Sequence, residues 1–570
     1  MIRPSSVSNR QLRPRGWRGP TGFRAGVWLL ASAAGPATAF AAETGEAPLR
    51  GMGAIDWLVL VGVAAALIGI GAYYSRRQKT AEDYFVADRN MSPFLVGISL
   101  YATICSTLTY LGLPGEIVQN GPVYLGATLV AFPVVYLVVG YLVIPFIMRL
   151  KVTSAYELLE ERLGLPVRLA TSAAFLMTRF VWMGLMLYTT SLILVTVMGW
   201  DTAWIPLISV ITGLITTTYS LVGGYSAVVI TDVLQFFILL LGAIATVICI
   251  TVLMGGVGAW WPAPWAAHWA PQPFFSADPH VRVTMVGTFA GAIIWWVATS
   301  TSDQMAVQRF LSTRDVAAAR RALLHNCIAA GSVVVVLGLV GYAVLGFYQT
   351  NPHFVPKHLS LAKNGDTLFP HFVGHFLPIG LPGLVVSGLL AAAMSSLSSG
   401  INSSATVLSK DFIETLAPDE HRKESTRVKH ARLLAMGVGI AAISASLLAD
   451  LISGNLVELG GKMVNLFLCP LFGVFFLALW VPFATPFGAI VGFLYSFVTA
   501  LLVGYWDVFA GGPAVSFQWI APMALTVSIA SGCLFSLLPT RGKPAPILAG
   551  YTLLALLPWV GVAVLLGRHA

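Results

Sequence analysis

Residues 99–116 read SLYATICSTLTYLGLPGE, so an apolar run is interrupted first by hydroxyl side chains and then by glycine and proline. Around this segment, 57% of the 570 residues are hydrophobic and only 10% are charged. An ordinary soluble chain carries about 45–50% apolar and about 25% charged residues. The chain is therefore predicted to be an all-α polytopic membrane protein. Backbone that leaves a helix inside a bilayer must line a cavity or be buried in protein, so this segment predicts such a place.

A second segment of this kind is WWVATSTSD at residues 295–303, where an apolar helix runs into hydroxyls and an acid. Glycine and proline are common in membrane helices generally, which explains one irregular helix more easily than a matched pair. Discontinuous helices in corresponding positions of two halves indicate the binding site of a secondary transporter. Each segment begins a set of five expected helices. Because five is an odd number, the second set crosses the membrane in the opposite orientation to the first. We therefore expect a five-plus-five inverted repeat, at about 90–255 and 283–480.

Fourteen apolar runs are long enough to cross a hydrocarbon core as helices, which takes about 20 residues. They start near residues 55, 92, 123, 164, 202, 223, 283, 322, 379, 428, 456, 484, 518 and 546. The connections between them are short, so we expect one membrane domain over residues 53–540 without a separate soluble module. Residues 541–570 are expected to hold the last transmembrane helix and the C-terminus.

Positive charge is distributed unevenly over the connections. Segments 76–89, 149–168, 309–321, 410–432 and 541–543 together hold twenty Lys and Arg residues. The opposite side of the mature chain holds five, which are Arg50, Arg282, Lys357, Lys363 and Arg568. Because cytoplasmic loops of membrane proteins are rich in Lys and Arg, the first group is predicted to be cytoplasmic. Both ends of the mature chain are then outside.

The N-terminus has the pattern of a signal peptide at residues 1–42. Six arginines and no acid occur in the first 24 residues, and a weak apolar stretch then ends in Ala39-Phe40-Ala41. A basic region, a short apolar region and an A-x-A-like end predict cleavage near Ala41 or Ala42. The alternative is an uncleaved amphipathic or short spanning helix, which Gly35-Pro36 disfavours. Much of the net charge of +9 belongs to this leader and to the cytoplasmic loops.

Several other classes of protein are excluded. The chain has too few charged residues for the surface of a soluble fold of this size. A soluble enzyme, a disordered protein and a nucleic-acid binder are therefore excluded. The five cysteines are odd in number, scattered and apolar in context, so neither a disulfide framework nor a metal-ligand spacing is present. The sequence also lacks a Walker motif, HExxH and GxSxG, so we expect neither ATP-driven transport nor an enzyme.

Residues 391–404, AAAMSSLSSGINSS, hold the densest polar cluster of any apolar run. At 100° per residue, Ser395, Ser398 and Ser399 share one helical face and Ser396 lies beside it. Hydroxyls are hard oxygen ligands, and carbonyls from an unwound neighbour would complete a site for a small hard cation. The alternative is structural, because small residues let membrane helices pack and their hydroxyls bond to their own helix. The residues alone leave both interpretations open.

Few ionisable residues lie inside the predicted helices. A carboxylate there is costly and faces a partner, a cavity or an ion, which makes Asp232 a candidate ligand. Its alternative is a solvated position at a helix start, where negative charge is favourable. Glu458 and Lys462 are spaced as a structural pair near the outer surface. Arg179 either neutralises an acidic solute or extends toward the inner surface.

Five segments together resemble the sodium:solute symporter family, whose members carry sugars, proline, pantothenate, sialic acid or monocarboxylates with sodium. They are TAEDYFVADR (80–89), SLYATICSTLTYLGLPGE (99–116), YSLVGGYSAVVITDVLQ (219–235), SDQMAVQRFLSTRD (302–315) and AAAMSSLSSGINSSATVLSKD (391–411). Their order and spacing match the family over about residues 53–540. The resemblance implies a LeuT-type fold, in which flanking helices accompany the five-plus-five inverted repeat.

The resemblance also implies where sodium binds, at the first broken helix and the serine-rich helix. The main site takes three carbonyls and two hydroxyls, from Ala102, Cys105, Ala392, Ser395 and Ser396. A second site, which some members have, takes hydroxyls and a carboxylate from Ser395, Ser398, Ser399 and Asp232. Na+ is therefore the expected coupling ion, with one or two ions per cycle.

The resemblance places the solute beside the two broken helices. The implied pocket residues are Ser106, Thr109, Tyr110, Trp182, Trp295, Trp296 and Thr299. Sugar carriers usually have a gating tyrosine near the position of Thr299, and sialic-acid carriers have an arginine where Trp182 precedes Met183-Gly184. Both departures count against these two solutes without selecting another.

The sequence thus predicts a secondary active transporter that couples sodium to a small organic solute by alternating access. Its expected surroundings are the lipid bilayer of a plasma membrane, namely a bacterial inner membrane, with no nucleic acid and no obligate protein partner. Two alternatives keep the same fold. One is a membrane sensor of solutes, and the other is an uncoupled sodium pathway.

Overall fold

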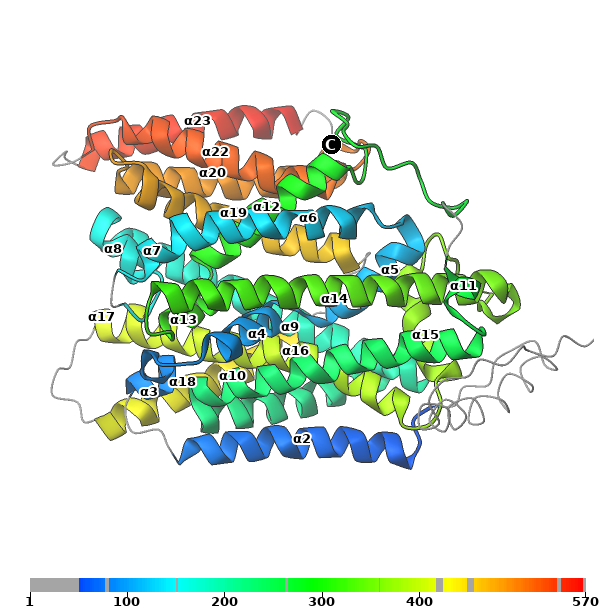
Figure 1. Cartoon of the computed structure of the whole chain (residues 1–570). Helices are drawn as coiled ribbons and strands as arrows, with labels where there is room; N and C mark the ends of the chain where they lie inside the picture. The colour runs from blue at the N-terminus through cyan, green and yellow to red at the C-terminus, as the bar shows by residue number, and fades with distance from the viewer. Residues whose placement is uncertain are drawn as a thin grey trace, which may run out of the picture.

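The computed structural model describes residues 51–76, 81–149, 152–261, 265–357, 359–416, 424–448, 456–540 and 545–566. The predicted signal peptide and the side chain of Glu458 lie outside the described part. The described residues form helices and no strand (Figure 1). Nine of these helices are long and apolar enough to cross a membrane, and a bent pair, α4 (Pro93–Ile104) with α5 (Thr107–Asn120), makes ten.

The remaining helices follow the order of the predicted runs. Those of the first half are α2 (Ala54–Ser75), α6 (Val123–Val138), α9 (Leu165–Met198) and α10 (Ile205–Leu253). Those of the second half are α12 (Met285–Ser302), α13 (Gln304–Leu311), α14 (Val316–Thr350), α16 (Leu381–Val407), α18 (Glu424–Ser446), α19 (Leu456–Trp480), α20 (Pro486–Gly504), α22 (Ile520–Ser536) and α23 (Ala545–Leu566).

Length and composition alone do not reach fourteen spans in the described residues. Gly224, at φ 56° and ψ −163°, divides α10 into two legs that count as one element. The apolar parts of α19 and α23 qualify only as the shorter helices Val464–Trp480 and Pro546–Leu556.

The first break has the predicted position. α4 ends at Ile104, Cys105 and Ser106 are extended, and α5 leaves at 70° to α4. The glycines and Pro114 that follow stay within α5. The hydroxyl-rich part of the segment, and not its glycine and proline, therefore marks the break.

The second break is shorter than predicted. We expected irregular backbone over Thr299–Asp303, but α12 is helical through Ser302 and only Asp303 leaves the helix, at φ −90° and ψ 119°. The Thr301 and Ser302 hydroxyls donate hydrogen bonds to the carbonyls four residues earlier, so they support the helix. The Asp303 carboxylate then accepts the Met305 N–H at 2.9 Å and caps α13.

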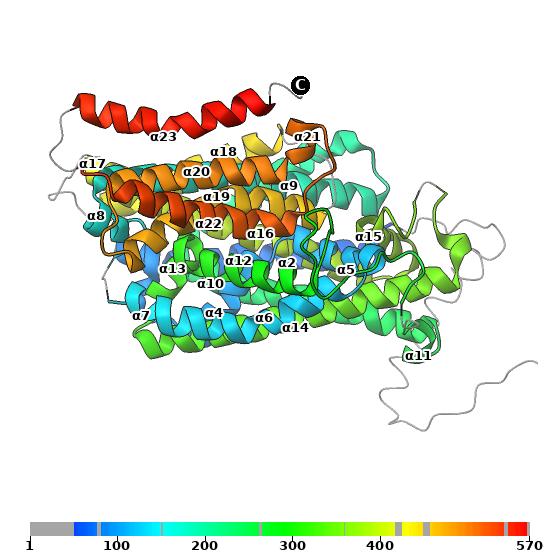
Figure 2. The same ribbon diagram turned by 90° about the horizontal axis from the view of Figure 1, so that it is seen from above.

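α16 lies in the interior, and almost every residue along it is buried. It packs against α2, α4, α9 and α10, and α2 and α23 lie at the periphery of the molecule (Figures 1 and 2). The short helices α3 (Ala81–Val86), α8 (Glu157–Leu163) and α17 (Glu414–Leu416) gather at one end of the molecule (Figure 1). The short helices α11 (Val257–Trp260) and α15 (Gly365–Phe376) lie at the opposite end. The described parts of three of the Lys- and Arg-rich connections, within 76–89, 149–168 and 410–432, thus share one end.

Asp56 of α2 fixes the start of α16. Its Oδ1 accepts the N–H groups of Gly380 and Gly383 at 2.9 and 2.7 Å, and its Oδ2 accepts the Gly53 N–H at 2.9 Å. Asp56→Ala is expected to destabilise the protein by about 1–3 kcal/mol, because buried donors lose their acceptor. A lower melting temperature of the purified variant checks this. Asp56→Asn keeps one acceptor oxygen and should recover part of the loss, whereas an unchanged Asp56→Ala would contradict the role.

Candidate functional site

The five residues of the predicted main sodium site lie together where the α4–α5 break crosses α16. The Ser395 hydroxyl donates to the Ala102 carbonyl at 2.6 Å and lies 3.3 Å from the Ala392 carbonyl. The Ser396 hydroxyl reaches the carbonyls of Thr103 at 2.8 Å and Cys105 at 3.4 Å. Five of these six oxygens belong to the predicted set, and the Thr103 carbonyl is an addition. Because hydroxyls can turn their protons away, the cluster offers a small cation about six oxygens.

Asp232 lies near this cluster and is fully buried within the second leg of α10. Its Oδ2 accepts hydrogen bonds from Ser99 at 2.6 Å, Thr103 at 3.2 Å and Ser399 at 3.4 Å. Its Oδ1 is buried without a hydrogen-bond partner. The alternative of a solvated position at a helix start is therefore wrong. A buried acceptor that lacks a donor suits a cation ligand, because such groups otherwise cost stability.

Arg309 is the residue of this cluster that sequence reasoning missed. We counted it among the cytoplasmic loop charges, but it is 1% exposed and forms an ion pair with Asp232, Nη2 to Oδ2, at 2.9 Å. The same nitrogen donates to the Ser399 hydroxyl at 2.6 Å, and Nε donates to the Ser99 hydroxyl at 3.1 Å. The pair neutralises the carboxylate and still leaves Oδ1 available.

The four residues of the predicted second site are not all directed at one point. Ser399 contacts Asp232, whereas Ser395 faces the Ala102 carbonyl of the main site. The Ser398 hydroxyl donates to the Ser395 carbonyl of its own helix at 3.1 Å. A second ion at this place would require Ser398 to rotate its hydroxyl.

A cavity of about 220 Å³ lies beside the α4–α5 break, between α5, α6, α9, α12, α19 and α22. It is lined by five of the seven predicted solute residues, namely Ser106, Thr109, Trp182, Trp295 and Trp296. Tyr110 does not line it, because its ring packs on Phe369 of α15 with 5.9 Å between the ring centroids. Thr299 is buried in α12 outside the cavity wall.

Most of the missed lining residues come from helices without a distinctive motif. About half of them are neutral polar or aromatic, namely Tyr101, Tyr124, Thr128, Phe132, Thr288, Asn465, Phe517 and Gln518, and most of the others are aliphatic residues or glycine. No Asp, Glu, Lys, Arg or His occurs among the residues that line this cavity. The wall can therefore meet a solute with hydroxyls, amides and aromatic rings, but not with a charged side chain.

Residues 84–495 match the model of the sodium:solute symporter family. The chain belongs to this family. This symporter is therefore a multi-pass membrane protein that couples the transport of a solute to sodium, and it is a transporter rather than an enzyme.

Individual relatives agree with this assignment. A sodium/sialic acid symporter of Proteus mirabilis is 29% identical over 473 residues, which cover 80% of this chain and 91% of the relative. A sodium-dependent multivitamin transporter of Oryctolagus cuniculus is 30% identical, with 79% of this chain and 70% of the relative covered. A solved Na+-coupled sialic acid symporter, substrate-bound and outward-open, matches at TM-score 0.72 and 28% identity, covering 85% of this chain and 98% of its own. The predicted sodium-symporter fold is thereby confirmed.

Proposed function

We propose that Na+ binds this symporter where the α4–α5 break meets α16, through the carbonyls of Ala102, Cys105 and Ala392 and the hydroxyls of Ser395 and Ser396. The observation that carries this proposal is the contact of two serine hydroxyls with carbonyls that the break has freed from the helix. Neutral oxygens from two separate helices hold a hard cation well and let it join those helices.

A second Na+ ion is proposed at Asp232, with the hydroxyls of Ser395, Ser398 and Ser399. The unpartnered Oδ1 of Asp232 supports it, because this oxygen is buried and needs a donor or a cation. Ser399→Ala is expected to lower the measured ratio of sodium to solute, since it removes a ligand and leaves the Asp232–Arg309 ion pair in place. Flux of ²²Na+ against labelled solute in proteoliposomes measures this ratio. An unchanged ratio would remove the second site.

The solute is proposed to be a small organic molecule bound in the cavity beside the break, near Ser106, Thr109, Trp182, Trp295 and Trp296. The volume of about 220 Å³ supports a small solute, because pockets for drug-sized ligands span about 300–1,000 Å³. Tyr110 and Thr299 do not line the cavity, so they would affect the solute only through the residues that do. Sialic acid is disfavoured, since its carboxylate would meet no basic side chain among the lining residues.

A thermal-shift screen against small metabolites tests the solute site. The right solute is expected to raise the melting temperature in sodium and to have little effect in potassium, because sodium orders the α4–α5 break beside the cavity. Ligands that bind the native state stabilise it by mass action. A solute that stabilises the protein equally in both salts would contradict sodium coupling at this site.

We further propose fourteen transmembrane helices in a plasma membrane, namely a bacterial inner membrane, with a symporter domain at 53–540 and a last helix within 541–570. Both ends of the mature chain are outside in this arrangement. The uneven distribution of Lys and Arg supports the orientation. A phosphatase that is active only outside the cytoplasm, fused after residue 570, is expected to be active. An inactive fusion on a folded protein would reverse the orientation.

A further inference from the structure

Two cavities follow one another along α9. The solute cavity and a smaller one of about 40 Å³ share Trp182 of α9 and Val464 of α19 in their walls. The smaller cavity extends from these two residues toward the start of α9, past Thr178 and Phe175. Trp182 and Val464 therefore separate the solute cavity from a second chamber, which is large enough for a few water molecules.

An ion pair borders the smaller cavity. Arg179 of α9 pairs through Nη2 with Oδ2 of Asp303, the single residue at the α12–α13 break, and both side chains are largely buried. The pair joins a long, regular helix to the point where α12 ends. Burying a charged pair is costly unless its geometry is good, so removing one partner alone is strongly destabilising.

A third barrier lies beyond the ion pair and is formed by Tyr156, in the connection between α7 (Ile144–Ile147) and α8. Tyr156 is fully buried, its ring centroid is 5.6 Å from that of Phe175 and 5.9 Å from that of Phe475 of α19, and its hydroxyl donates to the Ser302 carbonyl at 3.1 Å. The neighbouring Ala155 N–H donates to Gln304 Oε1 at 2.7 Å. This connection is thus attached on both sides of Asp303.

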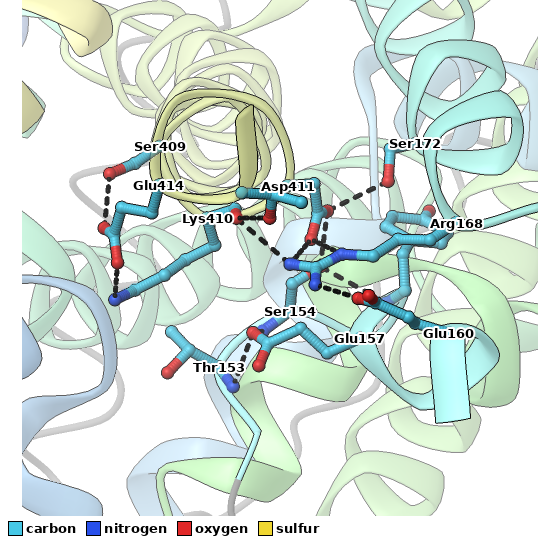
Figure 3. A network of polar contacts seen from close by, with 12 residues as sticks. Thr153, Ser154, Glu157, Glu160, Arg168, Ser172, Ser409, Lys410, Asp411 and Glu414 are labelled. Carbon is cyan, nitrogen blue, oxygen red and sulfur yellow. Dashed lines mark hydrogen bonds and ion pairs between the residues drawn. The ribbon is translucent and has the colours of Figure 1, made fainter. Parts of the chain in front are cut away.

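The same connection is held to the π-helical segment Leu408–Ile413, which continues α16 (Figure 3). The Ser154 hydroxyl donates to Asp411 Oδ2 at 2.6 Å, and Asp411 Oδ1 pairs with Arg168 at the start of α9, also at 2.6 Å. The Ser172 hydroxyl donates to Asp411 at 2.9 Å. One buried carboxylate therefore joins the connection, α9 and the helix that carries the proposed sodium ligands.

We propose that three layers form the gate that closes the solute cavity toward the Lys- and Arg-rich end of this symporter. The layers are Trp182 with Val464, the Arg179–Asp303 ion pair, and Tyr156. The inference rests on the proposed solute cavity and orientation, which make this end cytoplasmic. Release of the solute to the cytoplasm then requires the ion pair to separate and Tyr156 to leave its position.

Accessibility of a cysteine in the smaller cavity tests the gate without knowledge of the solute. Thr178→Cys is nearly isosteric, and its reaction with the membrane-impermeant methanethiosulfonate MTSET is followed from either side of oriented membrane vesicles in sodium. The unmodified protein gives the background from the five natural cysteines. We expect slow reaction of Thr178→Cys from both sides.

Adding Arg179→Gln with Asp303→Asn is expected to speed the reaction from the cytoplasmic side by about tenfold, because the closed state loses a contact that the open state lacks. The double change leaves no unpaired charge, and asparagine still caps α13. Adding Trp182→Ala instead should speed the reaction from the outside by about tenfold, since the two cavities then join.

A matched control removes a comparable ion pair elsewhere. Arg282 and Glu116 pair at 2.6 Å near the other end of the molecule, so Arg282→Gln with Glu116→Gln should leave cytoplasmic reaction of Thr178→Cys unchanged. Thr109→Cys, in the solute cavity, should react from the outside. If Thr109→Cys is inert, the proposed cavity fails. The gate is overturned by either of two results obtained while Thr109→Cys does react. In the first, Thr178→Cys already reacts fast from the cytoplasmic side; in the second, neither Arg179→Gln with Asp303→Asn nor Trp182→Ala changes its reaction rate.

Discussion

Ser396→Ala is expected to raise the sodium concentration for half-maximal uptake by about tenfold. A tenfold loss of affinity corresponds to the free energy of about one hydrogen bond to a charged group. The Ser396 hydroxyl contacts the Thr103 and Cys105 carbonyls directly at the break. Its loss removes one of the oxygens proposed for the ion and leaves these carbonyls without a donor when the site is empty. The maximal rate at saturating sodium should change much less, because the solute cavity is untouched.

Ser403→Ala is the matched control for this variant. Ser403 lies on the same buried helix, and its hydroxyl donates to the Gly400 carbonyl of that helix at 3.2 Å. It should therefore leave the sodium requirement unchanged. Sodium titrations of uptake in proteoliposomes compare the two. A normal requirement in Ser396→Ala, or an equal shift in both variants, would contradict the main sodium site.

Arg309→Met is expected to destabilise the protein by about 3–5 kcal/mol, because it leaves the Asp232 carboxylate buried and unpaired. Arg309 meets Asp232 and also donates to Ser99, Ser399 and the Met305 carbonyl at 2.9 Å. Low yield of folded protein and a much lower melting temperature are the expected readouts.

Adding Asp232→Asn to Arg309→Met separates charge burial from the loss of the other contacts. The double variant should recover most of the melting temperature, because no uncompensated charge remains, while ²²Na+ flux should still show an altered ratio of sodium to solute. If the double variant is as unstable as Arg309→Met, the arginine stabilises the protein through its other contacts and not by neutralising the Asp232 carboxylate.

The α4–α5 break could be predicted because its cause is local, and the spacing of the serines predicted a polar helix face, whereas the ligand set of the main cluster was implied by the resemblance to the sodium:solute symporter family. Hydroxyls at residues 99–107 compete with the helix, and serines at helical spacing present their oxygens on one face. The structure then adds only the Thr103 carbonyl to the predicted oxygens. The resemblance to the family implied seven solute residues, and five of them line the cavity because they lie on or beside the two broken helices.

Other features depend on which helices pack against one another, and a local sequence pattern does not predict these contacts. Arg309 and Arg168 look like ordinary loop charges, and each is buried because a distant carboxylate faces it. Asn465 of α19 and Gln518, in the turn just before α22, line the cavity only because these elements pack beside α12. The hydroxyls of Thr301 and Ser302 resemble those of the first break, yet they bond back to α12 and keep it regular.

Concentrative uptake in proteoliposomes tests the central claim most directly, with the solute that the thermal-shift screen identifies. The account predicts accumulation above the outside concentration only when sodium is present and its electrochemical gradient is directed inward. An inside-negative potential should increase it, because each inward charge gains about 2.3 kcal/mol per 100 mV. Uptake that merely equilibrates the solute, or sodium flux of equal size with no solute present, would contradict sodium-coupled symport.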